Sequence, residues 1–439
     1  MAPHSDAISH TAAASLITEE RGFASSDNAF PMTNRVTGPT PCKEPIMKAT
    51  VRRSLVAAAA VASVAVVPTA VAVAASPGTP QFGPQGPQRV HGQGPAVFVQ
   101  SDSPSGNQII VLDEHQDGRL SERQTVATGG LGGQASGAVV DQLASQDSLV
   151  YDPSRQLLFA VNAGSDSLSV LSAQGRQLRL VQVVKSGGTF PDSVAVSGNL
   201  VYVLNAGGSG ALSGFRIVGD QLAPLPGSSR SLGLANTTPP YFLASPGEVG
   251  FTPNGSELIV TTKSSTSSLD VFGVNPAGLL SAVPTVTSDP GNVPFSFTFS
   301  ASGQLVVAEA GPNALHSFAL GAGGTLTSVS SSVTDGQTAL CWITAVGGYD
   351  YVANAGSNSV SAYAVAPNGT PSLVGATGIV GTTDAGSIDM AASANGTTLY
   401  VEAGGAGAVD EFHLNAGGSL TDLGSVAGLG AGIEGIATD

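Results

Sequence analysis

Short apolar runs separated by turn residues recur along the chain from about residue 96 to its end. In the clearest of them, Ser359–Val365, apolar and small polar residues alternate, which is the pattern of a strand with one buried face. No stretch after residue 80 keeps the 3.6-residue period of an amphipathic helix over three turns. The pattern therefore predicts an all-β protein.

One strand in each repeat ends in a small polar motif, as in Ala160–Gly164 and Ala353–Gly356. Seven such strands can be aligned, and they recur about every 50 residues. The polar residues that end them are Gln100, Asn162, Asn205, Thr262, Glu309, Asn354 and Glu402. We call these residues the anchors. A repeat of this length in an all-β chain indicates a propeller or another array of similar units.

Each anchor lies in a longer unit. An apolar strand and a turn precede the anchor strand, and an alternating strand, a glycine-containing turn and a short fourth strand follow it. Asn275–Gly278 and Asn368–Gly369 are examples of the second turn. The unit therefore reads as a four-stranded antiparallel meander. Seven such units predict a seven-bladed β-propeller over residues 96–439.

The two ends of this region predict how the ring closes. The region starts near Ala96 with the strand that is second in every other unit, and it finishes with Glu434–Asp439, which aligns with a first strand. The terminal strands would then share one blade, and no sheet edge would stay open. The two longest departures from the repeat, Gly129–Gln146 and Leu232–Ser245, are predicted to be loops at the rim of a binding mouth.

Residues 47–75 read as a secretory signal peptide. A basic start is followed by an apolar run from Leu55 and by an Ala-x-Ala-like cleavage site at Ala72–Ala74. The pair Arg52-Arg53 weakly resembles a twin-arginine signal. An uncleaved anchor over Leu55–Ala75 is the alternative. Cleavage would give a protein that is secreted or held in the cell envelope, with no membrane span afterwards.

Two segments flank the signal. Residues 1–46 are polar and unpatterned, and we interpret them as a disordered, mis-called upstream extension of a chain that starts at Met47. Residues 76–95 are interpreted as a linker to the propeller.

Composition narrows the range of functions. Charged residues make up 11% of the chain, against about 25% in an average soluble protein. The formal net charge is −15, which argues against nucleic acid as a partner because phosphate binding needs clustered lysine and arginine. Cys341 lies between apolar neighbours and is expected to be a buried, unreactive thiol. We expect a monomer.

The string Val352–Ser361, Val-Ala-Asn-Ala-Gly-Ser-Asn-Ser-Val-Ser, resembles the Y-V-T-N type of propeller repeat. The region 96–439 resembles the seven-bladed lactonase-type propellers, which include 6-phosphogluconolactonase-like and carboxymuconate cyclase-like proteins; Pro191–Val196, Pro294–Phe299 and Leu399–Val401 are especially similar. The resemblance implies the propeller fold and a lactonase-like function. Such enzymes are expected to use histidine, arginine and glutamate at the channel mouth. Here Asp192, not histidine, follows Pro191, and His316 and His413 fall on third strands.

Alignment of the seven first strands predicts which side chains surround the channel. Five carboxylates fall within one residue of the same level: Asp147, Asp192, Glu248, Asp389 and Glu434. Like charges this close need a counter-ion or raised pKa values, so these five are predicted ligands of a Ca²⁺ ion on the propeller axis. Solvated carboxylates that bind nothing are the alternative.

Three of these carboxylates, Glu248, Asp389 and Glu434, are the candidate catalytic residues. Asp147, Asp192, Ser296 and the sole tryptophan, Trp342, are the candidate substrate-binding residues. The function predicted from the sequence is hydrolysis of a small sugar or organic-acid lactone at the channel mouth, with a lactone or carbohydrate-like ligand as partner. The alternative is a non-catalytic binding propeller outside the cell or on its surface.

Overall fold

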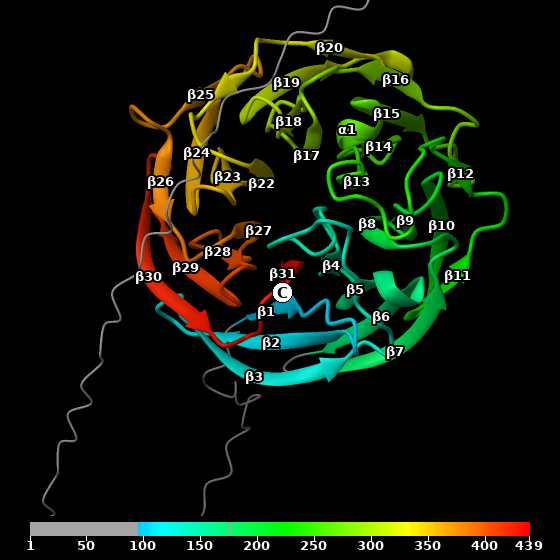
Figure 1. Cartoon of the computed structure of the whole chain (residues 1–439), viewed down its shortest axis with the longest axis horizontal. Coiled ribbons are helices and arrows are strands. Elements are labelled where there is room, and N and C mark those ends of the chain that lie inside the picture. Colours follow the sequence, from blue (N-terminus) through cyan, green and yellow to red (C-terminus); the bar gives the residue numbers. More distant parts are fainter. Residues whose placement is uncertain (1–94, 175–176) are drawn as a thin grey trace, which may run out of the picture. The chain divides into compact units, whose positions relative to one another are not determined.

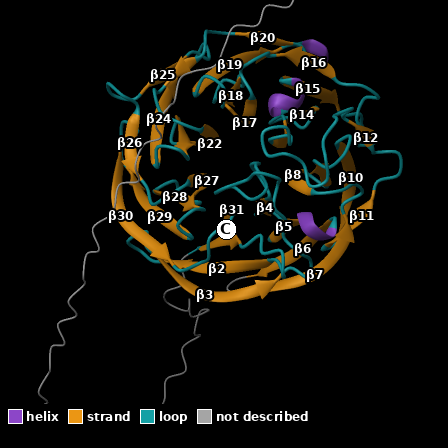
Figure 2. Cartoon of the chain, in the orientation of Figure 1, coloured by secondary structure: helices purple, strands orange, loops and turns teal. Residues whose placement is uncertain are grey.

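The computed structural model of the chain describes residues 95–174 and 177–439. The predicted upstream extension, the signal peptide and residues 76–94 of the linker lie outside the described residues. In the described part, seven antiparallel sheets form a ring of blades around a central channel (Figures 1 and 2). The predicted seven-bladed propeller is confirmed. No helix among the described residues has the length and hydropathy needed to cross a membrane.

Six blades follow one another along the chain, and each runs from an inner to an outer strand. Blade 2 contains β4(Leu149–Asp152), β5(Leu157–Asn162), β6(Ser167–Gln174) and β7(Gln177–Lys185), and blade 3 contains β8(Pro191–Ser197), β9(Leu200–Asn205), β10(Ala211–Val218), β11(Gln221–Pro224) and β12(Arg230–Ser231). Blade 4 contains β13(Glu248–Phe251), β14(Glu257–Thr261), β15(Ser268–Gly273) and β16(Thr285–Ser288). Its short helix α1(Lys263–Thr266) follows β14.

Blade 5 contains β17(Pro294–Phe299), β18(Leu305–Glu309), β19(Ala314–Leu320), β20(Leu326–Ser328) and β21(Val333–Thr334). Blade 6 contains β22(Leu340–Val346), β23(Tyr349–Asn354), β24(Ser359–Val365), β25(Pro371–Leu373) and β26(Ile379–Thr382). Blade 7 contains β27(Ser387–Ala392), β28(Thr398–Ala403), β29(Ala408–Leu414) and β30(Leu420–Ala427). In blades 3, 5 and 6 the outer edge is made of two short strands, both paired with the third strand, where the sequence predicts one.

Blade 1 closes the ring with both ends of the propeller. Its strands are β31(Ile436–Thr438), β1(Ala96–Gln100), β2(Gln108–Glu114) and β3(Leu120–Ala127), with β31 innermost. Phe98 pairs with Ala437 in the β1–β31 ladder, and the amide of Gln100 donates to the carbonyl of Gly435 at 2.9 Å. The predicted shared blade is therefore confirmed. The inner strands contact one another in the closed order β4, β8, β13, β17, β22, β27, β31 and β4.

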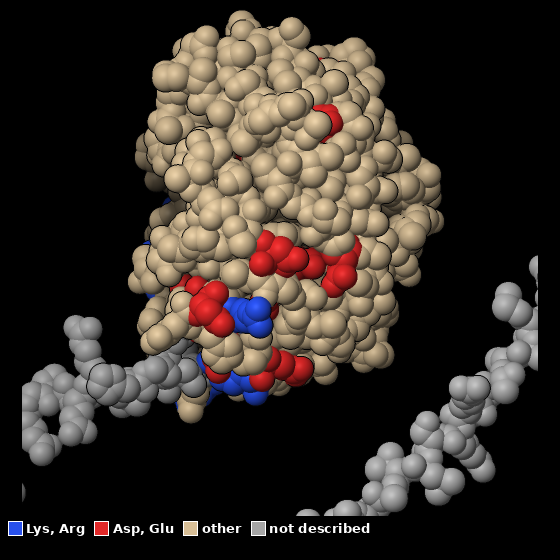
Figure 3. Space-filling view, turned by 90° about the vertical axis from the view of Figure 1, so that its left-hand side faces the viewer, with Lys and Arg blue, Asp and Glu red and all other residues tan. Residues whose placement is uncertain are grey.

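The burial of a strand depends on its position within the blade. The second strands are almost wholly buried, as all five residues of β1 and all six of β5 are, because both of their faces pack against neighbouring blades. The outer strands are made of exposed and partly buried residues, as β30 is. The surface view in Figure 3 carries few charged side chains, and most of the face it shows is neither acidic nor basic. This agrees with the low content of charged residues.

Candidate functional site

The two insertions predicted as rim loops meet each other over the channel. They are residues 129–146 and 232–245, and together we call them the cap. Ser136 forms a bridge with Tyr241; the amide of Ser136 donates to Pro240 at 2.8 Å, and the amide of Phe242 donates to Ser136 at 3.0 Å. The two loops are thus hydrogen-bonded to each other and form a single cover.

Residues 141–147, which comprise the end of the first cap loop and the residue after it, cross the channel axis. The indole Nε1 of Trp342, on blade 6, donates to the carbonyl of Ser145 at 3.0 Å. The amide of Ile343, also on blade 6, donates to Oε1 of Gln146 at 2.9 Å, and the amide of Gln146 donates to Gly247 at the start of blade 4 at 2.9 Å. Blades 4 and 6 therefore hold this segment across the mouth. The sequence singled out Trp342 but not Gln146.

Glycines that follow the anchors let the cap lie against the blades. A Cβ atom on Gly164 would come within 2.2 Å of the carbonyl oxygen of Gly132, and one on Gly404 would come within 2.3 Å of the carbonyl oxygen of Val140. Real Cβ contacts are never this short, so only glycine fits at these two positions. The glycine of the repeat motif thus allows the backbone of the cap to lie close to the blade.

Lys263 lies beneath the cap and is 1% exposed. Its Nζ donates to the carbonyl of Phe242 at 2.7 Å and also to the carbonyl of Ala144, so it touches both loops of the cap. It lies 4.8 Å from the centroid of the Phe295 ring. Burial lowers the pKa of Lys263 to about 8, and the carboxylates of Asp141 and Asp192 act in the opposite direction. Lys263 was not among the residues predicted from the sequence, although a lysine directly after an anchor occurs only in this repeat.

Two of the five predicted axial carboxylates, Asp192 and Glu434, lie on the Lys263 side of the cap. Oδ2 of Asp192 accepts a hydrogen bond from Ser245 at 3.1 Å. Oε2 of Glu434 accepts from the amide of Leu143 at 2.5 Å, and its carboxyl group is hydrogen-bonded to that of Asp141. Burial raises the pKa of both Asp192 and Glu434 well above the usual range. These groups hold the cap in place.

The other three, Asp147, Glu248 and Asp389, lie close enough together to interact electrostatically. Burial raises the pKa of Asp147 to about 7. The pKa values of Glu248 and Asp389 are raised well above their usual range, first by burial and then by the charge of Asp147. Oε2 of Glu248 accepts from the amide of Phe297 at 2.7 Å and from Nε2 of Gln146 at 3.3 Å. This group contains two of the three predicted catalytic residues.

Asp147 and Glu248 line a pocket in the channel, with a volume of about 360 Å³. The rest of its wall comes from the inner strands β4, β8, β13 and β17 and includes Phe251, Phe297 and Phe299. Asp147 is partly exposed to this space, whereas Glu248 is buried. The pocket therefore combines aromatic walls with two carboxyl groups whose pKa values are raised by burial.

The remaining predicted site residues are buried in the inner ring. The hydroxyl of Ser296 donates to the carbonyl of Cys341, and Trp342 packs edge-to-face on Phe295 with ring centroids 5.0 Å apart. Both side chains hold neighbouring blades together. Burial raises the pKa of the Cys341 thiol to about 12, so the thiol stays protonated, as expected.

The described residues give no cage of three axial carboxylates. Across residues 95–174 and 177–439, one set of three metal-ligand side chains has ligand atoms within 4.8 Å of one another, and it consists of Asp289, Glu309 and His316, outside the channel. The Ca²⁺ ion on the axis stays a prediction. His316 and His413 lie on the third strands β19 and β29, as the sequence indicated.

Comparison with known proteins supports the family resemblance. Residues 105–221 match the model of the family described as "Lactonase, 7-bladed beta-propeller". No curated protein matches the sequence. The chain is a seven-bladed β-propeller, as the repeats predict, and it is lactonase-like over residues 105–221.

Solved structures share the fold. The periplasmic gluconolactonase of Pseudomonas aeruginosa has a TM-score of 0.62 at 17% identity, over 78% of this chain and 98% of that one. A protein of Bacteroides uniformis, provisionally assigned as a 6-phosphogluconolactonase, has a TM-score of 0.61 at 19% identity, over 79% of this chain and 100% of that one. A protein of Lactobacillus plantarum has a TM-score of 0.62 at 17% identity, over 79% of this chain and 99% of that one. At these identities the likeness concerns the fold alone.

Proposed function

We propose that this lactonase-like propeller is an exported hydrolase that opens small lactones in its central channel. The observation that carries the proposal is the location and the raised pKa of the Asp147 carboxyl group. This group reaches the 360 Å³ channel pocket, shares that pocket with Glu248, and has a pKa of about 7. A general base works best when its pKa lies near the working pH.

The pair of carboxyl groups supplies the two proton transfers that lactone hydrolysis needs. Ionised Asp147 accepts a proton from a water molecule as the water oxygen attacks the lactone carbonyl carbon. The tetrahedral intermediate collapses by breaking the bond between that carbon and the ring oxygen. Protonated Glu248 donates its proton to the departing ring oxygen, and the product is a hydroxy acid. Solvent then takes the proton from Asp147 and returns one to Glu248.

The electrostatics support this division of roles. The negative charge of Asp147 raises the pKa of Glu248, so ionisation of the base keeps the acid protonated. Two carboxyl groups whose environments set different proton affinities are a common basis for acid and base roles in one site.

The walls of the pocket set the substrate class. Phe251, Phe297 and Phe299 offer aromatic surface, and rings of this kind pack on the apolar face of a sugar ring or on an alkyl substituent. The proposed substrate is therefore a small lactone with an apolar face, of the sugar or organic-acid type.

Variants at the proposed site and a control variant elsewhere test whether the channel pocket is the site of hydrolysis. Purified protein is screened against aldonolactones and alkyl-substituted lactones, with hydroxy-acid release as the readout. Asp147→Asn and Glu248→Gln should each lower kcat by about 100-fold or more. Asp350→Asn is the matched control, because burial raises the pKa of Asp350 to about 7 as well. Asp350 lies in β23, a second strand, and does not line the pocket. Activity that survives in both channel variants would reject the proposal.

Export is tested separately. Fractionation and N-terminal sequencing should find a mature end near Ala75 or Ser76 outside the cytoplasm. Cytoplasmic protein that still begins at Met47 would contradict export. The fold likeness to a periplasmic gluconolactonase supports this part of the proposal.

Binding without turnover is the second candidate function. The interlocked cap favours it, since Trp342, Gln146 and Lys263 fasten the cap over one mouth. A lactone or carbohydrate-like ligand would then enter the 360 Å³ pocket and leave unchanged. Saturable binding of a lactone with no release of hydroxy acid would favour this candidate.

A further inference from the structure

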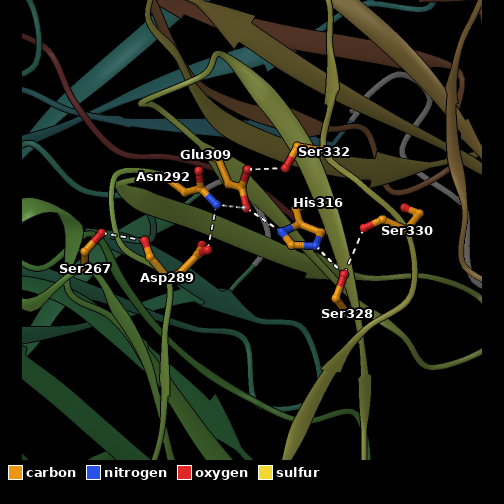
Figure 4. Close-up of polar contacts among 8 residues, drawn as sticks. All are labelled: Ser267, Asp289, Asn292, Glu309, His316, Ser328, Ser330 and Ser332. Carbon is orange, nitrogen blue, oxygen red and sulfur yellow. Dashed lines mark hydrogen bonds and ion pairs between the residues drawn. The ribbon is translucent and has the colours of Figure 1, made fainter.

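Three side chains that commonly bind metals meet at the boundary of blades 4 and 5. Asp289 follows β16, the outer strand of blade 4, while Glu309 ends β18 and His316 lies in β19. One ligand atom from each lies within 4.8 Å of the other two. Figure 4 shows the three side chains turned toward one another, with Asn292 between Asp289 and Glu309.

The two carboxylates are buried, and one oxygen atom has no hydrogen-bond partner. Glu309 is 0% exposed and Asp289 is 7% exposed. Oδ2 of Asp289 is buried and accepts no hydrogen bond, whereas Oδ1 accepts one from Nδ2 of Asn292 at 2.6 Å. Among the described residues neither carboxylate forms an ion pair with lysine or arginine. Burial of an oxygen atom without a hydrogen-bond partner is costly.

The hydrogen bonds of His316 define which nitrogen can bind a ligand. The hydroxyl of Ser328 donates to the carbonyl of Ser330 at 2.9 Å, so the contact of 2.7 Å between Ser328 and Nε2 of His316 must have Nε2–H as the donor. Nδ1 lies 2.6 Å from Oε1 of Glu309. Nδ1 therefore faces the two carboxylates, and the ring is held through its other nitrogen, as in many metal-binding histidines.

Each of the three groups supplies one ligand atom to a set whose members lie within 4.8 Å of one another. Ser332 donates to Oε2 of Glu309 at 2.7 Å, while Oε1 contacts Nδ1 of His316 and also accepts from Nδ2 of Asn292 at 3.3 Å. Asn292 holds Oδ1 of Asp289 and leaves Oδ2. Together with Nδ1 of His316, these atoms form a set of two oxygens and one nitrogen.

The same positions in blades 2 and 6 hold neutral residues. In blade 2, Nδ2 of the anchor Asn162 donates to Ser169 at 2.8 Å. In blade 6, Nδ2 of Asn354 donates to Ser361 at 3.0 Å. Glu309 and His316 occupy the equivalent pair of positions, seven residues apart. Since an asparagine–serine pair satisfies the fold there, the fold does not require the charged pair of blade 5.

We propose that Asp289, Glu309 and His316 bind one divalent transition-metal ion, most favourably Zn²⁺. One imidazole nitrogen and two carboxylate oxygens are ligands that Zn²⁺ accepts at about 2.0–2.2 Å. The ion would take the place of the proton between His316 and Glu309 and would also meet Oδ2 of Asp289. It would join the end of the outer strand of blade 4 to two strands of blade 5. This site lies outside the channel and is independent of the proposed hydrolysis.

Titration of the untagged full chain tests the site. Calorimetry with Zn²⁺ and absorption spectroscopy with Co²⁺ should give one equivalent of bound ion, and Zn²⁺ should raise the melting temperature. Asp289→Asn and His316→Gln should each weaken binding by about 100-fold. The matched controls should bind as the unchanged chain does: His413→Gln replaces the exposed histidine of β29, and Asp335→Asn replaces another buried aspartate with an unpartnered oxygen.

A measurement on the unchanged chain covers the case in which the variants do not fold. X-ray absorption of the Zn²⁺-loaded protein should show one imidazole together with oxygen ligands. No binding to the folded chain, binding that persists in both folded ligand variants, or a ligand set with sulfur or several imidazoles would each overturn the proposal.

Discussion

The indole Nε1 of Trp342 donates a hydrogen bond to the carbonyl of Ser145 at 3.0 Å. Trp342 belongs to the inner strand of blade 6, and Ser145 to the loop that precedes blade 2. Their contact links the cap to the inner wall of blade 6. The two residues are 2% and 0% exposed, so water does not replace this hydrogen bond easily.

Trp342→Phe should loosen the cap. The substitution leaves the buried carbonyl of Ser145 without the indole donor, which costs about 1–3 kcal/mol of stability. Hydrogen exchange should become faster in residues 141–147. Tyr363→Phe is the control, since it also removes a hydrogen bond to a backbone carbonyl, that of Val333, but far from the cap. Equal exchange in residues 141–147 of both variants would contradict this role of Trp342.

Lys263→Met should destabilise the protein by about 3–5 kcal/mol, because it removes one partner of a buried charged cluster. The methionine keeps most of the volume of the side chain, but the carbonyls of Ala144 and Phe242 lose their donor, and Asp141 and Asp192 lose the nearby positive charge. Chemical denaturation measures the loss. Lys185→Met is the control, since Lys185 is exposed. The same small effect in both variants would show that the cap does not depend on Lys263.

Deletion of residues 432–439 should open the ring. The deletion removes β31 and its ladder to β1 and exposes the edge of β1, which can then pair with another molecule. Light scattering should detect aggregation, and the melting temperature should fall. A truncated chain that melts and scatters like the full chain would contradict closure by the shared blade.

Stability should fall as the pH rises from about 5 to 8. Burial raises the pKa of Asp350 and of Asp147 to about 7, so the folded state binds protons more tightly than the unfolded state does. A carboxyl group of this kind favours folding below its unfolded pKa, about 3.9, and that contribution is lost as the pH rises through 7. Melting curves at a series of pH values measure the slope. Asp350→Asn should flatten it, and an unchanged or steeper slope in that variant would contradict the assignment.

The repeats predicted the fold well because each anchor strand carries its own local signal. Asn162, Asn205 and Asn354 each end a buried second strand, and the terminal strands were placed by alignment with these units. Local pattern and turn chemistry are repeated seven times, so an error in one unit does not change the fold.

The site was only partly predictable. Alignment of the first strands placed Asp147, Glu248 and Asp389 near one another, but it could not show that residues 141–147 cross the axis and separate them from Asp192 and Glu434. That division depends on contacts between residues about 100 to 290 positions apart, such as those of Gln146 with Glu248 and of Glu434 with Leu143. Loop paths of this kind leave no periodic trace in the sequence.

The pH dependence of kcat/KM for lactone hydrolysis tests the central claim most directly. With Asp147 as the base, kcat/KM should rise with pH and level off above the pKa of Asp147, about 7, and it should fall again where Glu248 loses its proton. Asp147→Asn should remove the rise near pH 7 and lower kcat/KM by about 100-fold or more. The same rise near pH 7 and the same rate in Asp147→Asn would contradict the account.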